Sequence, residues 1–193
     1  LDPTVIDPDT HKTDFVGTYN KTLAICHALK EREDAGEPIA AVVLDGIDIL
    51  LKDCEMVMRY QDLKIDETKR LSQMWDWQNR NTKFYAVVYM AKRMKCRRFF
   101  TTHYKDKKQL VGTELITTEK IPIWQDQFPG KMAQRIFLER KDLKDSVVFE
   151  AKIGKAKGAL YLEGQKYVVA EVKSTTKEAH WYGLHDFYRE VER

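Results

Sequence analysis

A chain of 193 residues with 43% hydrophobic and 33% charged residues is long enough to bury one core and has the composition of a globular domain. The net charge of +3 is too small to identify an anionic partner, and no apolar run approaches the roughly 20 residues that cross a bilayer. The three cysteines form no C-x-x-C pair, which excludes that type of zinc site and a disulfide framework. We therefore expect one domain, residues 1–193, in the reducing cytoplasm and without a membrane partner.

The first predicted elements are a helix and a buried strand. Residues 14–33 carry apolar side chains at helical spacing and stop at a turn signal over 35–38. The apolar run 39–44 is typical of a strand buried on both faces, and Asp45 and Gly46 follow it directly. Open α/β sheets bind ligands at the carboxyl ends of their strands, so Asp45 is the first candidate site residue. An Asp-Gly pair is also a common turn, and that alternative stays open.

A helical crossover should lead from this strand to a second one. A short helix over 54–60 is followed by a long helical pattern that starts at Asp66 and is strongest over 84–94. The apolar stripe of this pattern indicates packing in the core. The second buried strand covers 96–100. Strand, helix, strand in this order predicts a right-handed crossover and a parallel sheet.

Three polar side chains follow the second strand, namely Thr101, Thr102 and His103. A threonine hydroxyl and the ring nitrogens of histidine can hydrogen-bond a phosphate or an attacking water. Together with Asp45, these residues resemble the Walker B aspartate and the polar sensor strand of the RecA-like P-loop ATPases of the ASCE class. No G-x-x-x-x-G-K-[ST] loop occurs in the chain, so the resemblance is to the part of that core downstream of the Walker A loop.

This resemblance covers about residues 4–169 and implies an α/β fold. It implies a three-layer sandwich with a mainly parallel RecA-like sheet over about 1–120, extended by antiparallel hairpins over about 121–193. We expect the phosphate-binding loop to precede Leu1. The alternative is a degenerate member that binds nucleic acid as a non-catalytic scaffold.

The resemblance also implies a function, which is ATP hydrolysis by a motor or recombinase-type core that acts on DNA or RNA. Its implied cofactors are ATP and Mg²⁺, with Asp45 as the metal ligand and Gly46 beside the nucleotide. Thr102 and His103 would act with Asp45 in catalysis, and Asp48 is a weaker ligand candidate. The implied assembly is a ring or filament of identical subunits.

The second half of the chain reads as short strands. We expect strands over 136–138 and 146–149, then a hairpin that joins 158–162 to 167–170 through a turn. The aromatic segment 181–187 reads as a last helix or loop. Three lysines follow the 146–149 strand, and by the resemblance Lys155 would aid catalysis while Lys152 and Lys157 would reach a nucleotide held by a neighbouring subunit. A solvated hairpin turn is the alternative for these lysines.

Two other functions fit parts of the sequence. Glu171 and Lys173 form an E-x-K pair on a predicted strand, as in the PD-(D/E)xK metal-dependent nucleases, with Glu163 as the nearest third acid. A non-catalytic nucleic-acid scaffold would instead use clustered cations. These are Lys92, Arg93, Lys95, Arg97 and Arg98. Its stacking platforms would come from Trp75, Trp77, Trp124 or Trp181.

Overall fold

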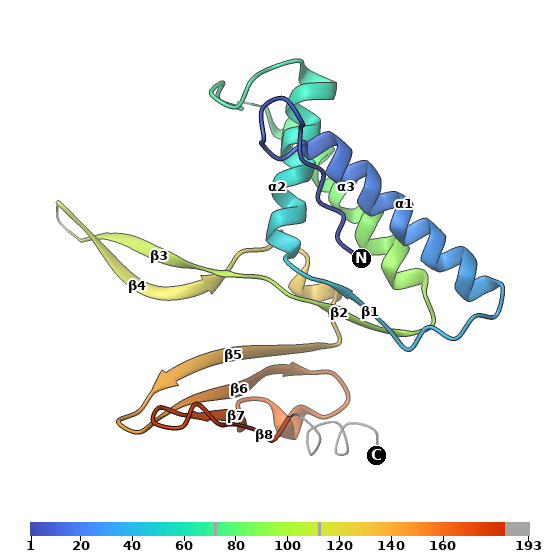
Figure 1. Cartoon of the computed structure of the whole chain (residues 1–193). Coiled ribbons are helices and arrows are strands. Elements are labelled where there is room, and N and C mark those ends of the chain that lie inside the picture. The colour runs from blue at the N-terminus through green and yellow to red at the C-terminus, as the bar shows by residue number, and fades with distance from the viewer. Residues whose placement is uncertain (72, 112, 184–193) are drawn as a thin grey trace. The chain divides into compact units, whose positions relative to one another are not determined.

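The computed structural model describes residues 1–71, 73–111 and 113–183. The chain divides into two compact units, Leu1–Gln125 and Asp126–Arg193. The first unit holds the helices α1 to α3 and the strands β1 to β4, and the second holds β5 to β8 (Figure 1). Among the described residues, no helix combines the length and apolar character needed to cross a bilayer.

Three helices of the first unit pack against one another: α1 (Phe15–Asp34), α2 (Ile47–Val57) and α3 (Met74–Arg93). The prediction for α1 is confirmed, and Asp14 caps this helix because its carboxylate accepts a hydrogen bond from the Gly17 amide at 2.9 Å. The side chains buried on these helices include Cys26, Cys54, Met56, Phe84, Val87, Val88 and Ala91.

The helix expected over 54–60 begins earlier in the structure, since α2 starts at Ile47 directly after the first strand. A π-helical turn, η1 (Met58–Leu63), continues α2. The long helix expected from Asp66 begins only at Met74. Arg59 explains the delay, because its guanidinium donates 2.8 Å to the Lys69 carbonyl and so holds the preceding segment in an irregular loop.

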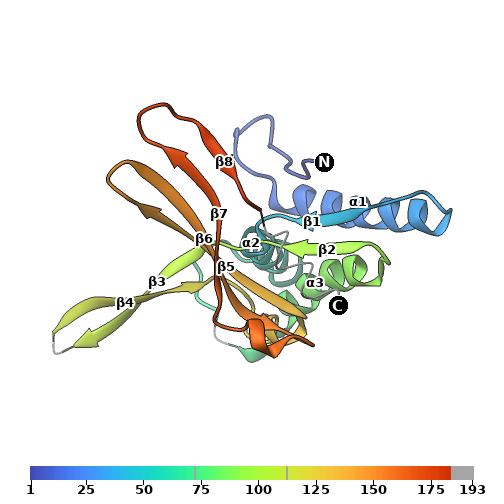
Figure 2. The same ribbon diagram turned by 90° about the horizontal axis from the view of Figure 1, so that it is seen from below.

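Strands β1 (Ala41–Leu44) and β2 (Arg97–Phe100) form a two-stranded parallel sheet, as the order strand, helix, strand predicts. Their register pairs Ala41 with Arg97 and Leu44 with Phe100. The three helices lie on one side of this pair (Figure 1), and the view from below shows β1 and β2 next to each other (Figure 2). The carboxyl ends of the two strands therefore lie at the same edge.

The prediction of a mainly parallel, three-layer RecA-like sandwich is wrong. Among the described strands only β1 and β2 pair in parallel, and every other pair is antiparallel. Strand β1 is also not buried on both faces, because Val42 is 7% exposed whereas Val43 is 57% exposed. The physical reason lies in the connections, since short turns join the strands after β2, and a short turn can join only antiparallel neighbours.

A charged hairpin follows β2 and was not expected from the sequence. It consists of β3 (Tyr104–Val111) and β4 (Glu114–Pro122), paired antiparallel with an irregularity between Lys107 and Lys108. Its polar, charged strands carry little of the apolar alternation that marks a half-buried strand.

The second unit is a four-stranded antiparallel sheet in the order β5-β6-β7-β8. Its elements are η2 (Pro129–Lys131), β5 (Gln134–Asp142), β6 (Ser146–Ala156), η3 (Leu160–Leu162), β7 (Lys166–Lys173) and β8 (Ala179–Trp181). Its core holds Ile153, Ala156, Ala159 and Leu162, with Ile136 and Tyr167 packed against them.

The hairpin expected between 158–162 and 167–170 is wrong. Residues Leu160–Leu162 form a short 3₁₀ helix, and β7 pairs with β6 instead. The apolar run 158–162 is explained by burial of Leu162 in the core of the second unit rather than by strand pairing. Of the aromatic segment expected over 181–187, residues 184–187 lie outside the described residues.

Candidate active site

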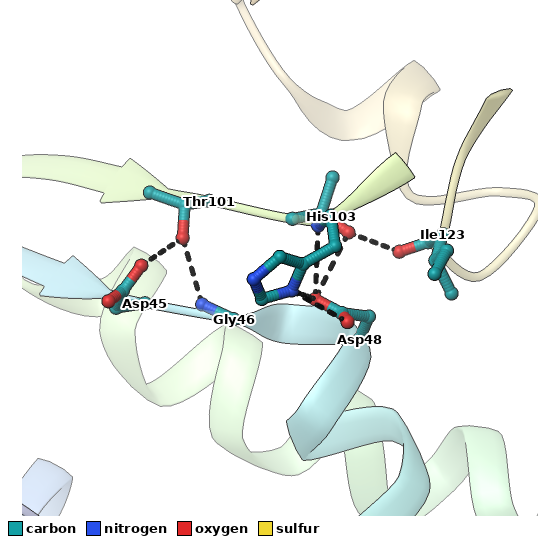
Figure 3. Close-up of polar contacts among 7 residues, drawn as sticks. Asp45, Gly46, Asp48, Thr101, His103 and Ile123 are labelled. Atoms are coloured by element: carbon teal, nitrogen blue, oxygen red, sulfur yellow. Dashed lines mark hydrogen bonds and ion pairs between the residues drawn. The ribbon is translucent and has the colours of Figure 1, made fainter. Parts of the chain in front are cut away.

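Four polar side chains and the backbone amide of a glycine lie together at the carboxyl ends of β1 and β2 (Figure 3). We call this group the polar cluster, and it consists of Asp45, Gly46, Asp48, Thr101 and His103. The first three residues lie at the junction of β1 and α2, and the last two directly follow β2. The parallel pairing of the two strands thus brings together residues more than 50 positions apart in the sequence.

Thr101 joins the two strand ends. Its hydroxyl donates a hydrogen bond to Asp45 Oδ1 and accepts one from the Gly46 amide at 2.8 Å (Figure 3). The Thr101 carbonyl accepts a further hydrogen bond from the Ile47 amide at 2.8 Å. Gly46 has φ +75°, a left-handed conformation that favours glycine, and it allows the chain to turn directly from β1 into α2. Thr101 and Gly46 therefore fix the position of the Asp45 carboxylate.

His103 and Asp48 form the second contact of the polar cluster. The His103 Nδ1 atom lies 3.0 Å from Asp48 Oδ2, and the His103 amide lies 3.3 Å from Oδ1. A carboxylate can only accept, so Nδ1 carries the hydrogen and Nε2 remains to contact a ligand. The His103 side chain is 69% exposed and that of Asp48 is 12% exposed. Asp48 therefore orients an imidazole whose other nitrogen is accessible.

Thr102, predicted to act with Asp45, points elsewhere. Its hydroxyl donates to the Ile123 carbonyl and lies 3.4 Å from Asp48 Oδ1. Consecutive residues of an extended chain point to opposite sides, so only one of the two threonines can reach Asp45. The structure brings Thr101 to the carboxylate, and Thr102 attaches the end of β2 to the segment after β4.

The three lysines predicted to contact a nucleotide lie in the second unit, on or just after β6. Lys152 and Lys157 are exposed. The Lys155 ammonium lies 3.5 Å from the carbonyls of Pro129 and Gly130, so it has local partners.

The acids proposed for a nuclease do not come together within the sheet. Glu171 pairs with Val148 of β6, whereas the Glu163 carboxylate accepts a hydrogen bond from the Ala156 amide at 3.0 Å. Val148 and Ala156 are eight residues apart along β6, which corresponds to about 26 Å. Among the described residues no three His, Cys, Asp or Glu side chains converge as a metal site. Lys173 ends β7 and is two residues after Glu171, so the strand pattern places both on the same face of the sheet. Glu163 does not join them as a third acid.

The predicted basic stripe lies at the junction of α3 and β2 and is only partly available to a ligand. The Arg98 guanidinium donates to the carbonyls of Lys92 and Met94 at 3.0 and 2.7 Å, so it caps the end of α3. Phe99, which is 39% exposed, is the neighbouring aromatic residue. Trp75 is 69% exposed but lies at the opposite end of the 20-residue α3, about 27 Å away along the helix.

The structure does not favour any of the three cysteines as a nucleophile. Burial raises the pKa of Cys26, Cys54 and Cys96, which disfavours the reactive thiolate form. All three thiols are free.

A cavity of about 570 Å³ beside β1 was not foreseen from the sequence. It contains Asp53, a residue of α2 that is only 4% exposed. Burial raises the pKa of this carboxyl from 3.8 to about 6. The available signal was an aspartate one turn after Ile49 and Leu50, on the apolar side of a helix.

Comparison of the chain with models of known protein families gives no match, and comparison with curated proteins gives none either. The residues of the polar cluster therefore carry the functional argument.

Proposed function

We propose that the polar cluster is part of a magnesium-dependent site for nucleoside triphosphate hydrolysis, and that the protein acts on DNA or RNA. The observation that carries the proposal is the convergence of two carboxylates, a hydroxyl and an accessible imidazole at the carboxyl edge of a parallel strand pair. That edge is where open α/β sheets bind ligands. The family resemblance of Asp45 and of the residues after β2 supports the same activity.

The residues present fit a magnesium ion. Mg²⁺ prefers carboxylate oxygens and is commonly held by one or two carboxylates together with water and substrate phosphates. Asp45 is exposed, and within the described parts of the chain its Oδ2 atom has no hydrogen-bond partner. Asp45 would hold the ion directly or through water, with Asp48 nearby on α2. An ion held there would supply positive charge close to the phosphates of a bound nucleotide.

The imidazole of His103 supplies the proton chemistry of the proposal. With Nδ1 donating to Asp48, a neutral His103 offers the lone pair of Nε2 to a proton of the attacking water. A protonated His103 instead donates from Nε2 to a phosphate oxygen. Thr101 keeps the Asp45 carboxylate in place and presents no hydrogen to the ligand, because its single proton is donated to Asp45.

The remaining parts of the proposal concern partners. A ring or filament of identical subunits would allow Lys152, Lys155 or Lys157 of one subunit to contact a nucleotide on the next, where added positive charge favours departure of the leaving group. The cations of residues 92–98 would contact nucleic-acid phosphates. A cytoplasmic location belongs to the same proposal.

The deciding experiment is the Asp45→Asn substitution in the full-length protein. The amide keeps the volume of the side chain and removes the charge that orients the metal, so ATP turnover should fall on the order of 10²-fold or more. Exposed Asp9 provides a matched control, since Asp9→Asn should leave turnover unchanged. Circular dichroism checks that both variants remain folded.

Turnover of the Asp45→Asn variant at the parental rate would overturn the proposal. Magnesium-dependent cleavage of DNA without nucleotide, abolished by Glu171→Gln, would favour the nuclease alternative instead. Nucleic-acid binding that falls steeply with salt, in a protein without any ATP hydrolysis, would favour the scaffold.

A further inference from the structure

The cavity beside β1 lies next to a strand and two helices. It is lined by the first residues of the chain, by one side of α1, by β1 and by the start of α2. The apolar residues that line it include Ile25, Leu29, Val43, Ile49 and Leu50. Its volume of about 570 Å³ lies in the range of small-molecule and peptide-side-chain pockets.

One wall of this cavity is an unpaired strand edge. The carbonyls of Ala40 and Leu44 accept hydrogen bonds from the amides of Arg97 in β2 and Thr101 directly after it, at 3.3 and 3.1 Å. Backbone groups alternate along a strand, so those of Ala41 and Val43 point away from β2, and both residues line the cavity. Within the described parts of the chain, no strand pairs with that edge of β1. An unpaired edge next to apolar side chains favours the addition of an extended strand.

The second observation is a buried carboxylate. Asp53 lies one turn after Ile49 and Leu50 on α2, lines the cavity and is 4% exposed. No hydrogen bond or ion pair from the described residues reaches its carboxylate, and burial raises its pKa to about 6. A buried carboxylate without a partner is costly, and a cation in the cavity removes that cost.

The charges on the residues that line the cavity are mostly negative. Its charged lining side chains are those of Asp2, Asp45 and Asp53, and among the described residues no Lys, Arg or His side chain lines it. Leu1, which also lines it, carries one α-ammonium group, so the lining is net negative. This composition favours a cationic group and disfavours phosphates or acidic peptides.

We propose that this cavity binds an extended polypeptide segment of another protein, which adds as a strand to the free edge of β1 and places a Lys or Arg side chain against Asp53. Strand β1 has four residues, so about four to seven residues of the partner can pair with it. Alternate residues of the segment face the helices, and these are apolar on both sides of the basic residue. The inference does not depend on ATP hydrolysis, and its test measures peptide binding alone.

The probe is a fluorescein-labelled peptide with the sequence Thr-Val-Thr-Lys-Thr-Val-Thr, in which one face presents two valines around a lysine. Fluorescence anisotropy with the 193-residue chain should show saturable binding. The same peptide with Glu in place of Lys should bind at least about tenfold more weakly, because a charge-assisted hydrogen bond is lost. A peptide methylated on its backbone nitrogens should not bind, because it cannot pair with β1.

Variants of the protein locate the site. Asp53→Asn should weaken binding of the lysine peptide about tenfold or more, whereas Glu31→Gln, at an exposed position of α1 that does not line the cavity, should leave it unchanged. Ile49→Lys is a second variant, which places a cation at the rim of the cavity. Ile49 is 54% exposed, so this change is compatible with folding and should also weaken binding.

Three results would overturn the inference. The first is absence of binding, or equal binding of the Lys and Glu peptides. The second is displacement of the peptide by single-stranded DNA at equimolar concentration, which would assign the cavity to an anion. The third is a dimer of the chain that Ile49→Lys dissociates, which would make a second copy the occupant.

Discussion

The polar cluster and the cavity beside β1 both depend on an aspartate of α2, and the two aspartates have opposite surroundings. Asp48 contacts the His103 imidazole at an exposed edge, whereas Asp53 is buried and has no partner among the described residues. Water and a hydrogen-bond donor stabilise a carboxylate, and burial without a partner destabilises it. The comparison teaches that the exposed His103 side chain can be changed at little cost to the fold, whereas the charge of Asp53 lowers the stability of the protein.

The largest expected effect is on ATP turnover, and it tests whether the polar cluster is catalytic. His103→Ala should lower ATP turnover by about 10²- to 10⁴-fold, the usual contribution of a general acid or base. Because the His103 side chain is 69% exposed, the free energy of unfolding should change by less than about 0.5 kcal/mol. Steady-state hydrolysis and urea unfolding of the same protein measure the two quantities.

Asp48→Asn is the companion variant, because Asp48 acts as a positioning residue through His103. An amide can donate to Nδ1 and thereby favours the wrong tautomer of the ring, so the dependence of turnover on pH should change as well as the rate. Parental turnover in both variants would remove His103 from the proposed site.

The next effect tests the cavity. Asp53→Asn should raise the free energy of unfolding by about 1–3 kcal/mol at pH 8, since the pKa of Asp53 rises from 3.8 to about 6 on folding. A raised carboxyl pKa means that the folded protein holds the proton more tightly than the unfolded chain. The native protein therefore loses stability as the pH rises from about 4 to about 6, and the asparagine variant does not.

The two proteins should consequently differ in stability at pH 8 and agree at about pH 3.5. Urea unfolding at both values makes the measurement, with Glu31→Gln as a surface control. If Asp53→Asn were no more stable than the native protein at pH 8, an unpaired buried charge at this position would be contradicted.

The smallest effect concerns the contact between the two strand ends. Thr101→Val should lower the free energy of unfolding by about 1 kcal/mol, because the Gly46 amide loses its acceptor. Thr101→Ser retains the hydroxyl and should restore most of this loss. Equal stability of the valine variant and the native protein would show that water replaces the hydroxyl at this edge.

The sequence was sufficient to predict the parts of the fold that depend on local pattern. The apolar runs 39–44 and 96–100 predict β1 and β2, and their parallel pairing explains why residues after both strands meet. The sequence did not indicate that Thr101, and not Thr102, contacts Asp45, because this depends on the residue at which β2 ends. If β2 ended one residue later, the two threonine side chains would exchange sides of the strand.

Other features depended on contacts that no local pattern contains. The hairpin of β3 and β4 forms through backbone pairing of charged strands, and Leu160–Leu162 turns because Leu162 enters a core made by β6. The burial of Asp53 follows from the packing of α2 against other elements, so the sequence shows only a carboxylate at an unusual position of a helix.

Helix α2 carries Asp48 at one end and Asp53 five residues later. It is therefore shared by the polar cluster and the cavity, and a helix of 11 residues moves as a rigid rod. Any ligand whose binding at one site displaces this rod changes the affinity at the other site, and linkage requires the change to be equal in both directions. A nucleotide and a peptide partner that met on this chain would thus regulate each other through a single turn and a half of helix.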